Sequence, residues 1–120
     1  MKPQITRLSF VLGVLALGTS VFAHAFLDHS DPKVGSTIGK SPAAVSIWFT
    51  QQPEPAFSKI ALADTSGKAA VSAESQVDKD DAKVMHLPLP QLSAGRYAVH
   101  WTAVATDGHR TQGDFAFIVK

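Results

Sequence analysis

Apolar and polar residues alternate with a period of two along much of the chain beyond residue 23. The clearest example is Arg96–Val104, in which Tyr97 and Trp101 fall on the same face. The same alternation runs through Val45–Thr50 and Asp114–Val119. Because successive side chains of a β-strand point to opposite faces of a sheet, this pattern predicts three strands, each with one face in the core.

Three further segments are weaker strand candidates: Phe26–Ser30, Ser58–Ala63 and Lys83–Leu87. No segment shows a helical period of ordinary length, and there is no internal repeat. About seven short strands predict an all-β fold, a Greek-key β-sandwich or barrel of cupredoxin-like or immunoglobulin-like type. Five turn-forming segments separate the strands: Gly35–Pro42, Gln52–Pro55, Asp64–Gly67, Asp78–Lys83 and Ser93–Gly95. We interpret the charged segment Asp78–Lys83 as a solvated loop.

The first 23 residues have the three parts of a secretory signal peptide. A basic start, Met1–Arg7, precedes an apolar stretch, Leu8–Leu17, and small residues follow. The apolar stretch is shorter than the roughly 20 residues that span a membrane. We therefore expect cleavage after Ala23, which leaves residues 24–120 as one exported domain without stable membrane insertion. Cleavage after Ala25 fits the preference for small residues nearly as well.

Chain length and charge exclude several classes of protein. A length of 120 residues fits one domain, which excludes a multidomain enzyme. The chain has 11 basic and 10 acidic residues and no run of lysine or arginine, so it lacks the electrostatic footprint of a nucleic-acid-binding protein. Removal of the signal peptide takes away Lys2 and Arg7 and leaves a net charge of −1.

The absence of cysteine restricts any metal site to nitrogen and oxygen donors. With zero cysteines, the chain has no disulfide, no thiolate nucleophile, no iron–sulfur or cysteine zinc site and no blue-copper centre. Five histidines are present, and two of them stand out by position. His24 becomes the N-terminal residue if cleavage follows Ala23, and His109 follows the predicted strand Arg96–Val104.

Both histidines have neighbouring groups that favour metal binding. An N-terminal His24 offers an α-amine and an imidazole, which can close a chelate ring on one ion. Asp107 and His109 are separated by Gly108, and side chains at positions i and i+2 of an extended chain lie on the same side. Gly108 tolerates whatever backbone angles bring both side chains onto one ion. Together these groups supply three nitrogens and one carboxylate.

This donor set suits Cu(II), which favours imidazole and amine nitrogens with a carboxylate in a tetragonal arrangement and heads the affinity order for such ligands. Zn(II) is the competing metal, because it accepts histidine and aspartate in tetrahedral sites. An ordinary turn is the alternative to a metal site, because Asp-Gly is a common turn dipeptide. Spacing alone does not bring His24 and His109 together.

Short motifs along residues 24–120 match one protein family in order and spacing. They are His24–Leu27, Ser30–Pro32, Ile47–Thr50, Ser93–Tyr97, Val99–Trp101, Val104–His109, Gly113 and Phe117–Lys120. In these motifs the chain resembles the CopC-like periplasmic copper-binding proteins, which are associated with copper resistance and homeostasis. The resemblance implies a cupredoxin-like β-sandwich that binds one Cu(II) per chain through the amine and imidazole of His24, Asp107 and His109.

The chain departs from the family at positions that bear on the metal. Some members carry a methionine-rich loop for Cu(I), but the two methionines here are Met1 and Met85, so we expect no Cu(I) site. Gln51 stands where many members have a glutamate near the copper, and it adds no charge. Phe26 replaces a histidine that members often have at the third mature position. His29 is interpreted as a surface residue in preference to a fifth or outer ligand of the metal.

The two remaining histidines fall in predicted strands. His100 lies on the face opposite Trp101, so we interpret it as an exposed residue paired across strands. His86 is interpreted as a packing residue at least as readily as a ligand. Trp48 and Trp101 are predicted to be core or near-core aromatics.

We expect a periplasmic protein that sequesters or carries Cu(II) for copper homeostasis or resistance and is not an enzyme. The family resemblance suggests a CopD-like inner-membrane copper transporter as a partner. One alternative is a copper-dependent oxygenase, because such enzymes also chelate copper with an N-terminal histidine. The other alternative is a metal-free exported accessory module with the same fold.

Overall fold

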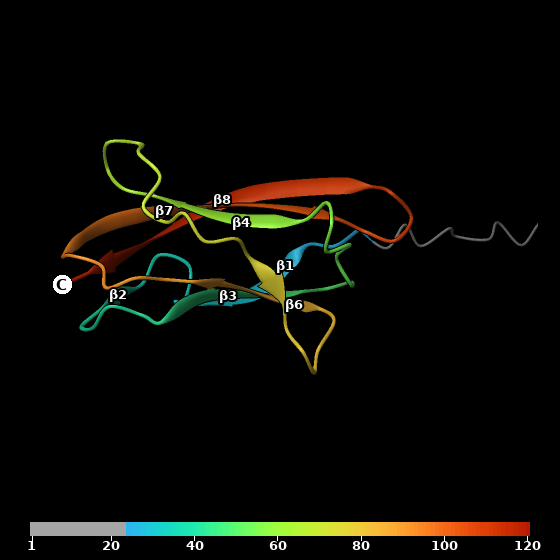
Figure 1. The fold of residues 1–120 in the computed structure, drawn as a ribbon, viewed down its shortest axis with the longest axis horizontal. Coiled ribbons are helices and arrows are strands. Elements are labelled where there is room, and N and C mark those ends of the chain that lie inside the picture. The colour runs from blue at the N-terminus through green and yellow to red at the C-terminus, as the bar shows by residue number, and fades with distance from the viewer. Residues whose placement is uncertain (1–23) are drawn as a thin grey trace, which may run out of the picture.

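Two four-stranded β-sheets lie face to face in the computed structural model, which describes residues 24–120 (Figure 1). The predicted signal peptide lies outside the described residues. Within them there is no helix, and so none that could span a membrane. The all-β prediction is therefore confirmed. The strands are β1 (Leu27–Asp31), β2 (Thr37–Ile38), β3 (Ala44–Phe49), β4 (Lys59–Ala63), β5 (Gln76–Val77), β6 (Val84–Pro88), β7 (Gly95–Val104) and β8 (Arg110–Val119).

Each sheet contains strands that are distant in sequence. One sheet has the order β1-β3-β6-β5 and the other has the order β2-β8-β7-β4. All neighbouring strands are antiparallel except β2 and β8, which are parallel. The chain crosses between the sheets repeatedly, so residues of both sheets contribute to one core.

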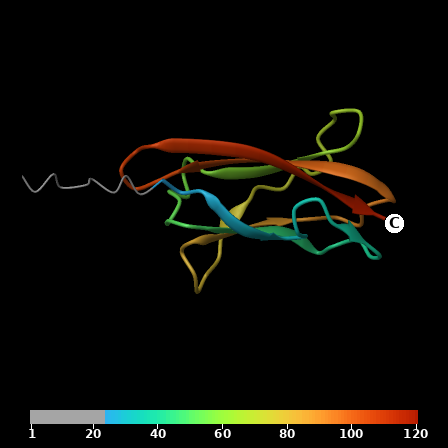
Figure 2. The same ribbon diagram turned by 180° about the vertical axis from the view of Figure 1, so that it is seen from behind.

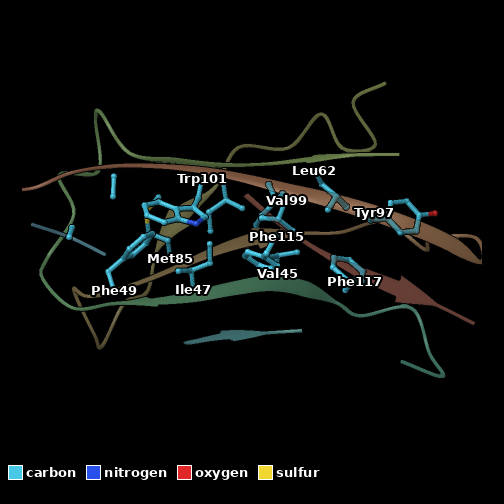
Figure 3. Close-up of a cluster of buried hydrophobic side chains, with 14 of the residues drawn as sticks. Val45, Ile47, Phe49, Leu62, Met85, Tyr97, Val99, Trp101, Phe115 and Phe117 are labelled. Carbon is cyan, nitrogen blue, oxygen red and sulfur yellow. The ribbon is translucent and has the colours of Figure 1, made fainter. Parts of the chain in front are cut away.

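The core occupies the space between the sheets (Figure 3). Alternate residues of β3, β7 and β8 point into it and are buried, as the period of two predicts. Trp101 packs edge-on against Phe49 of the opposite sheet, with ring centroids 5.5 Å apart. Trp48 lies on the outer face of β3 and is partly exposed, so of the two tryptophans Trp101 is the core residue.

Two short strands were not predicted. The segment Gly35–Pro42, expected to be a turn region, contains β2. Strand β5 lies just before the charged segment Asp78–Lys83, the acidic loop. Each is two residues long, too short for alternation to be visible. Strand β8 also begins at Arg110 rather than at Asp114. Thr111 and Gly113 occupy inward positions of β8, and neither is a large apolar residue.

A hydrogen-bonded network on the outer face attaches the acidic loop to the sheet. His86 of β6 lies between two partners, with Nδ1 2.6 Å from the Ser46 hydroxyl of β3 and Nε2 2.7 Å from a carboxylate oxygen of Asp78. The other oxygen of Asp78 accepts the backbone N–H groups of Asp80 and Asp81, each at 3.0 Å. The loop is exposed as expected, but Asp78 is a structural residue rather than a purely solvated one.

One end of the sandwich brings the start of the described chain beside the turn between β7 and β8. Figure 1 shows the blue segment that leads into β1 reaching the same end as the orange-to-red turn, and Figure 2 shows the same arrangement from behind. The start of the described chain and the turn that follows β7 therefore lie at one end of the fold.

Substitution of Gly113 tests the packing of the core tryptophan. A Cβ atom added at Gly113 would lie 2.7 Å from Cζ2 of Trp101, which is buried and cannot move freely. We expect Gly113→Ala to lower the free energy of unfolding by about 1–3 kcal/mol, as overpacking of cores does, measured by urea denaturation. Gly39→Ala is the matched control, because an added Cβ there has no atom within 4 Å. Equal stability of the two variants would contradict the packing described.

The Asp78 network predicts a pH-dependent contribution to stability. The hydrogen bond from His86 lowers the pKa of Asp78, and the backbone N–H groups of Asp80 and Asp81 act in the same direction against burial. An unfolded aspartate has a pKa of about 3.9, so the ionised side chain stabilises the fold above that pH. This contribution is lost as the pH falls through the lower pKa of the folded state.

We therefore expect Asp78→Asn to be less stable than the wild type at pH 6, with the difference shrinking as the pH is lowered to 2. Urea denaturation at several pH values measures this difference. Asp80→Asn is the control, because it removes an exposed charge from the same loop and leaves the bonds of Asp78 in place. A difference between wild type and Asp78→Asn that stays constant with pH would be evidence against the network.

Candidate metal centre

The segment before β1 carries His24 to the end of the sandwich. Ala25 has 0% of its surface exposed and belongs to the core cluster, so the segment is anchored by burial. Phe26 points outward and is 52% exposed, with its ring centroid 5.6 Å from that of His24. Two threonines also hold this segment, Thr50 and Thr111, and the sequence analysis missed both. His24 is thus fixed on one side by the core and flanked by an exposed aromatic ring.

The turn between β7 and β8 presents Asp107 and His109 side by side. Gly108 adopts a φ of 86°, a left-handed conformation that glycine takes without a steric cost. Its backbone N–H donates to the carbonyl of Ala105 at 2.9 Å, which closes the turn. Oδ1 of Asp107 accepts the backbone N–H of His109 at 3.0 Å. Asp107 and His109 therefore come together through a turn at Gly108, and not through the extended chain that the sequence analysis assumed.

The structure brings His24, Asp107 and His109 together. The rings of His24 and His109 meet edge to face, with centroids 5.0 Å apart and planes at 75°. Nδ1 of His109 is 2.9 Å from Oδ2 of Asp107. The side chains of His109 and Asp107 are 48% and 37% exposed, so the cluster is open to solvent at the end of the sandwich.

The local electrostatics favour an ionised carboxylate. The backbone N–H of His109 is the main cause that lowers the pKa of Asp107, and the His109 side chain adds to it. Burial opposes this shift, while the charges of His109 and His24 contribute to it. Asp107 therefore favours its ionised form beside the two histidine rings.

The side chains of this cluster do not form a complete metal site by themselves. Within residues 24–120, no group of three or more histidine, cysteine, aspartate or glutamate side chains could hold a metal ion as arranged. Asp107 and His109 bond to one another, and the α-amine considered in the sequence analysis is a backbone group that exists only after cleavage. What the structure provides is proximity of the three residues.

The other histidines are engaged elsewhere. The ring of His29 stacks on Trp48, with centroids 4.4 Å apart, and its Nδ1 is 2.7 Å from a carboxylate oxygen of Asp28. Nδ1 of His100 is 2.8 Å from Oδ1 of Asp114, the residue opposite it on β8. The interpretation of His100 as an exposed cross-strand residue is confirmed. Gln51, the residue in place of a family glutamate, is exposed.

Comparisons with known proteins agree with this fold. The CopC domain family model matches residues 27–120. Protein YobA of Escherichia coli (strain K12) is 30% identical over 124 residues, which cover 100% of both chains. CopC from Methylosinus trichosporium OB3b has a TM-score of 0.75 at 32% identity, over 81% of this chain and 94% of that one. PcoC, a methionine-rich copper resistance protein from Escherichia coli, has a TM-score of 0.72 at 32% identity, over 82% and 100%. The chain therefore belongs to the CopC family.

Proposed function

We propose that this protein binds one Cu(II) ion at the end of the sandwich through His24, Asp107 and His109. The observation that carries the proposal is the contact of the His24 and His109 rings beside the Asp107 carboxylate. His24 is far from the other two residues in sequence, and the fold brings its ring to theirs at the exposed end of the sandwich. Cleavage after Ala23 would add the α-amine of His24 as the fourth donor.

The distance between the Asp107 and His109 donors is compatible with one shared ion, as it is in the three other histidine–aspartate pairs, and the neighbouring ring of His24 distinguishes this pair. Two ligands about 2.0 Å from one metal and at right angles to each other are about 2.8 Å apart. Oδ2 of Asp107 and Nδ1 of His109 are 2.9 Å apart, held by a hydrogen bond. Asp107 and His109 would hold Cu(II) through these two atoms, and His24 would supply the remaining nitrogen donors.

The donors favour Cu(II) over Cu(I). Nitrogen and carboxylate ligands suit Cu(II), while Cu(I) is stabilised by thioether or thiolate sulfur. Met85 is 1% exposed and lies in the core, so it is not a ligand at the surface. This chain differs in that respect from the relative PcoC, which is methionine-rich. A site without soft ligands holds copper in one oxidation state and favours sequestration or transport over redox turnover.

The burial of Ala25 supports cleavage after Ala23. Cleavage after Ala25 would remove a residue that is 0% exposed and part of the core, together with His24. Cleavage after Ala23 keeps the core intact and places the new amine on His24.

The signal peptide directs the protein to the periplasm, where the mature protein sequesters copper or carries it to a CopD-like inner-membrane transporter. Membership of the CopC family supports this copper-handling role over the oxygenase and the metal-free accessory module. The protein is a copper-binding protein and not an enzyme.

Loss of either histidine is expected to abolish tight copper binding. Removal of residues that merely support metal ligands costs about 10–100-fold in affinity, and His24→Ala or His109→Ala removes a ligand itself. We expect both variants of the mature protein to bind Cu(II) at least about 100-fold more weakly than the wild type, measured by competition with a chelator. The wild type is expected to bind one equivalent.

His100→Ala is the matched control for these variants. His100 also pairs with an aspartate through Nδ1, at 2.8 Å, and its side chain is 49% exposed, but it lies in the middle of β7 on the outer face of the sheet. Its loss is expected to leave the affinity unchanged. Wild-type affinity in His109→Ala, or an equal loss in His100→Ala, would mean that copper binds elsewhere.

The contribution of the α-amine can be tested separately from the imidazole. Protein exported with its own signal peptide is expected to have the mass of residues 24–120. A mature protein with one glycine added before His24 keeps the imidazole but displaces the amine. We expect this protein to bind Cu(II) about tenfold or more weakly, with fewer nitrogen donors in its electron paramagnetic resonance spectrum. A mature mass that starts at Phe26, or an extended protein with wild-type affinity and spectrum, would rule out the amine as a ligand.

A further inference from the structure

The segment that carries His24 precedes β1 and is held mainly by side-chain hydrogen bonds, together with one backbone bond from Thr50 to Phe26. Residues 24–26 belong to no strand, and β1 begins at Leu27. Chain termini fray unless they are tied down by burial or hydrogen bonds. The chelate proposed above needs both the backbone nitrogen and the ring of His24 in defined places. What fixes this segment therefore bears directly on copper binding.

Thr50 fixes the segment from the sheet that contains β3. It follows the last residue of β3, and its hydroxyl donates to the carbonyl of His24 at 3.0 Å. The same hydroxyl accepts the backbone N–H of Phe26 at 3.0 Å. The backbone N–H of Thr50 in turn donates to the carbonyl of Phe26 at 2.8 Å. One threonine thus bonds three backbone groups on both sides of Ala25.

Thr111 fixes the segment from the other sheet. It lies on β8 opposite Ala103, at an inward position near the end of the sandwich, two residues after His109. Its hydroxyl donates to the carbonyl of Ala25, with a longer contact of 3.3 Å to the carbonyl of Ala103. The methyl group of Ala25 is buried in the core at the same point. Residue 25 is therefore held through its side chain and its carbonyl.

We propose that Thr50 and Thr111 are positioning residues that hold the His24 chelate over the turn carrying Asp107 and His109. This inference rests on the proposed function. Neither threonine touches the ion, and each acts through the backbone of residues 24–26. Fixing these residues before copper arrives removes the ordering cost from the binding step, so the affinity is higher than a frayed terminus would give. Because the hydroxyls come from different sheets, they restrain the segment in two directions.

The hydroxyl groups are tested by substitution with valine, which keeps the shape of threonine and loses the hydrogen bonds. We expect Thr50→Val and Thr111→Val in the mature protein to weaken Cu(II) binding by about 10–100-fold, the range seen for residues that orient metal ligands. Thr50→Ser and Thr111→Ser keep the hydroxyl and are expected to restore the affinity to within about threefold. Thr102→Val is the matched control, because Thr102 lies on the outward side of β7 in the same hairpin.

A merely structural role is distinguished by two further measurements. In the glycine-extended chain the amine of His24 is already displaced. The valine substitutions are expected to lower the Cu(II) affinity of that chain by about threefold or less, because two changes that act through the same group are not additive. Hydrogen exchange of the Phe26 amide in the metal-free protein reports the Thr50 bond without copper. We expect protection in the wild type and rapid exchange in Thr50→Val.

The outcomes separate this inference from the proposed function. If the wild type binds one Cu(II) and His109→Ala loses it, but both valine variants keep wild-type affinity, the positioning role is wrong and the copper site stands. If the wild type binds no copper, both proposals fail. If a valine variant does not fold, hydrogen exchange of the Phe26 amide in the wild type still tests the positioning role. Exchange of that amide at the rate of an unstructured terminus overturns it.

Discussion

The burial of Ala25 in the shared core is the constraint on which the arrangement of the candidate site depends. A small side chain enters the end of the sandwich, and the residue before it must then lie over that end. The turn between β7 and β8 lies at the same end, because the two ten-residue strands pair along their whole length. The first pair is Gly95 with Val119, and the last pair, beside the turn, is Val104 with Arg110. His24 meets His109 because two independent features of the fold, a buried anchor and a long hairpin, finish at one point.

The same constraint leaves the site open. A cluster at the end of a sandwich has core on one side and solvent on the other, and the partly buried His24 and the half-exposed His109 follow from that position. Exposure suits a protein that takes up and releases an ion, because a closed site would need a conformational change for each exchange. The hydrogen bonds of residues 24–26 would compensate for exposure at the proposed copper site, because they restrict the movement of His24 relative to His109.

The sequence predicts the strands better than it predicts the contacts between them. Alternation identified β3, β7 and most of β8, because each places several large apolar side chains on one face. It failed at the start of β8, where Gly113 leaves space for the indole of Trp101 rather than filling the core itself. Asp107 and His109 were predictable as a pair because they are two residues apart. Thr50 and Thr111 were not predictable, because a threonine in or beside a strand is ordinary. Their hydrogen bonds also cross long stretches of sequence, 26 residues for Thr50 and 86 residues for Thr111.

Pairing of histidine with aspartate does not by itself identify a metal site in this protein. Among residues 24–120, four histidines lie within 2.9 Å of an aspartate oxygen through a ring nitrogen, and three of these pairs are spread over the outer faces of the sheets. Both ring nitrogens of His86 take part in hydrogen bonds within the fold, and the exposed ring of His29 stacks on Trp48. In the fourth pair, His109 also contacts the ring of a second histidine at the predicted mature terminus. Convergence of two chain segments, rather than the chemistry of one pair, therefore distinguishes the site. A metal ion gains from several donors only when the fold has already brought them together, and the anchor at Ala25 gives His24 the position that the proposed copper site requires.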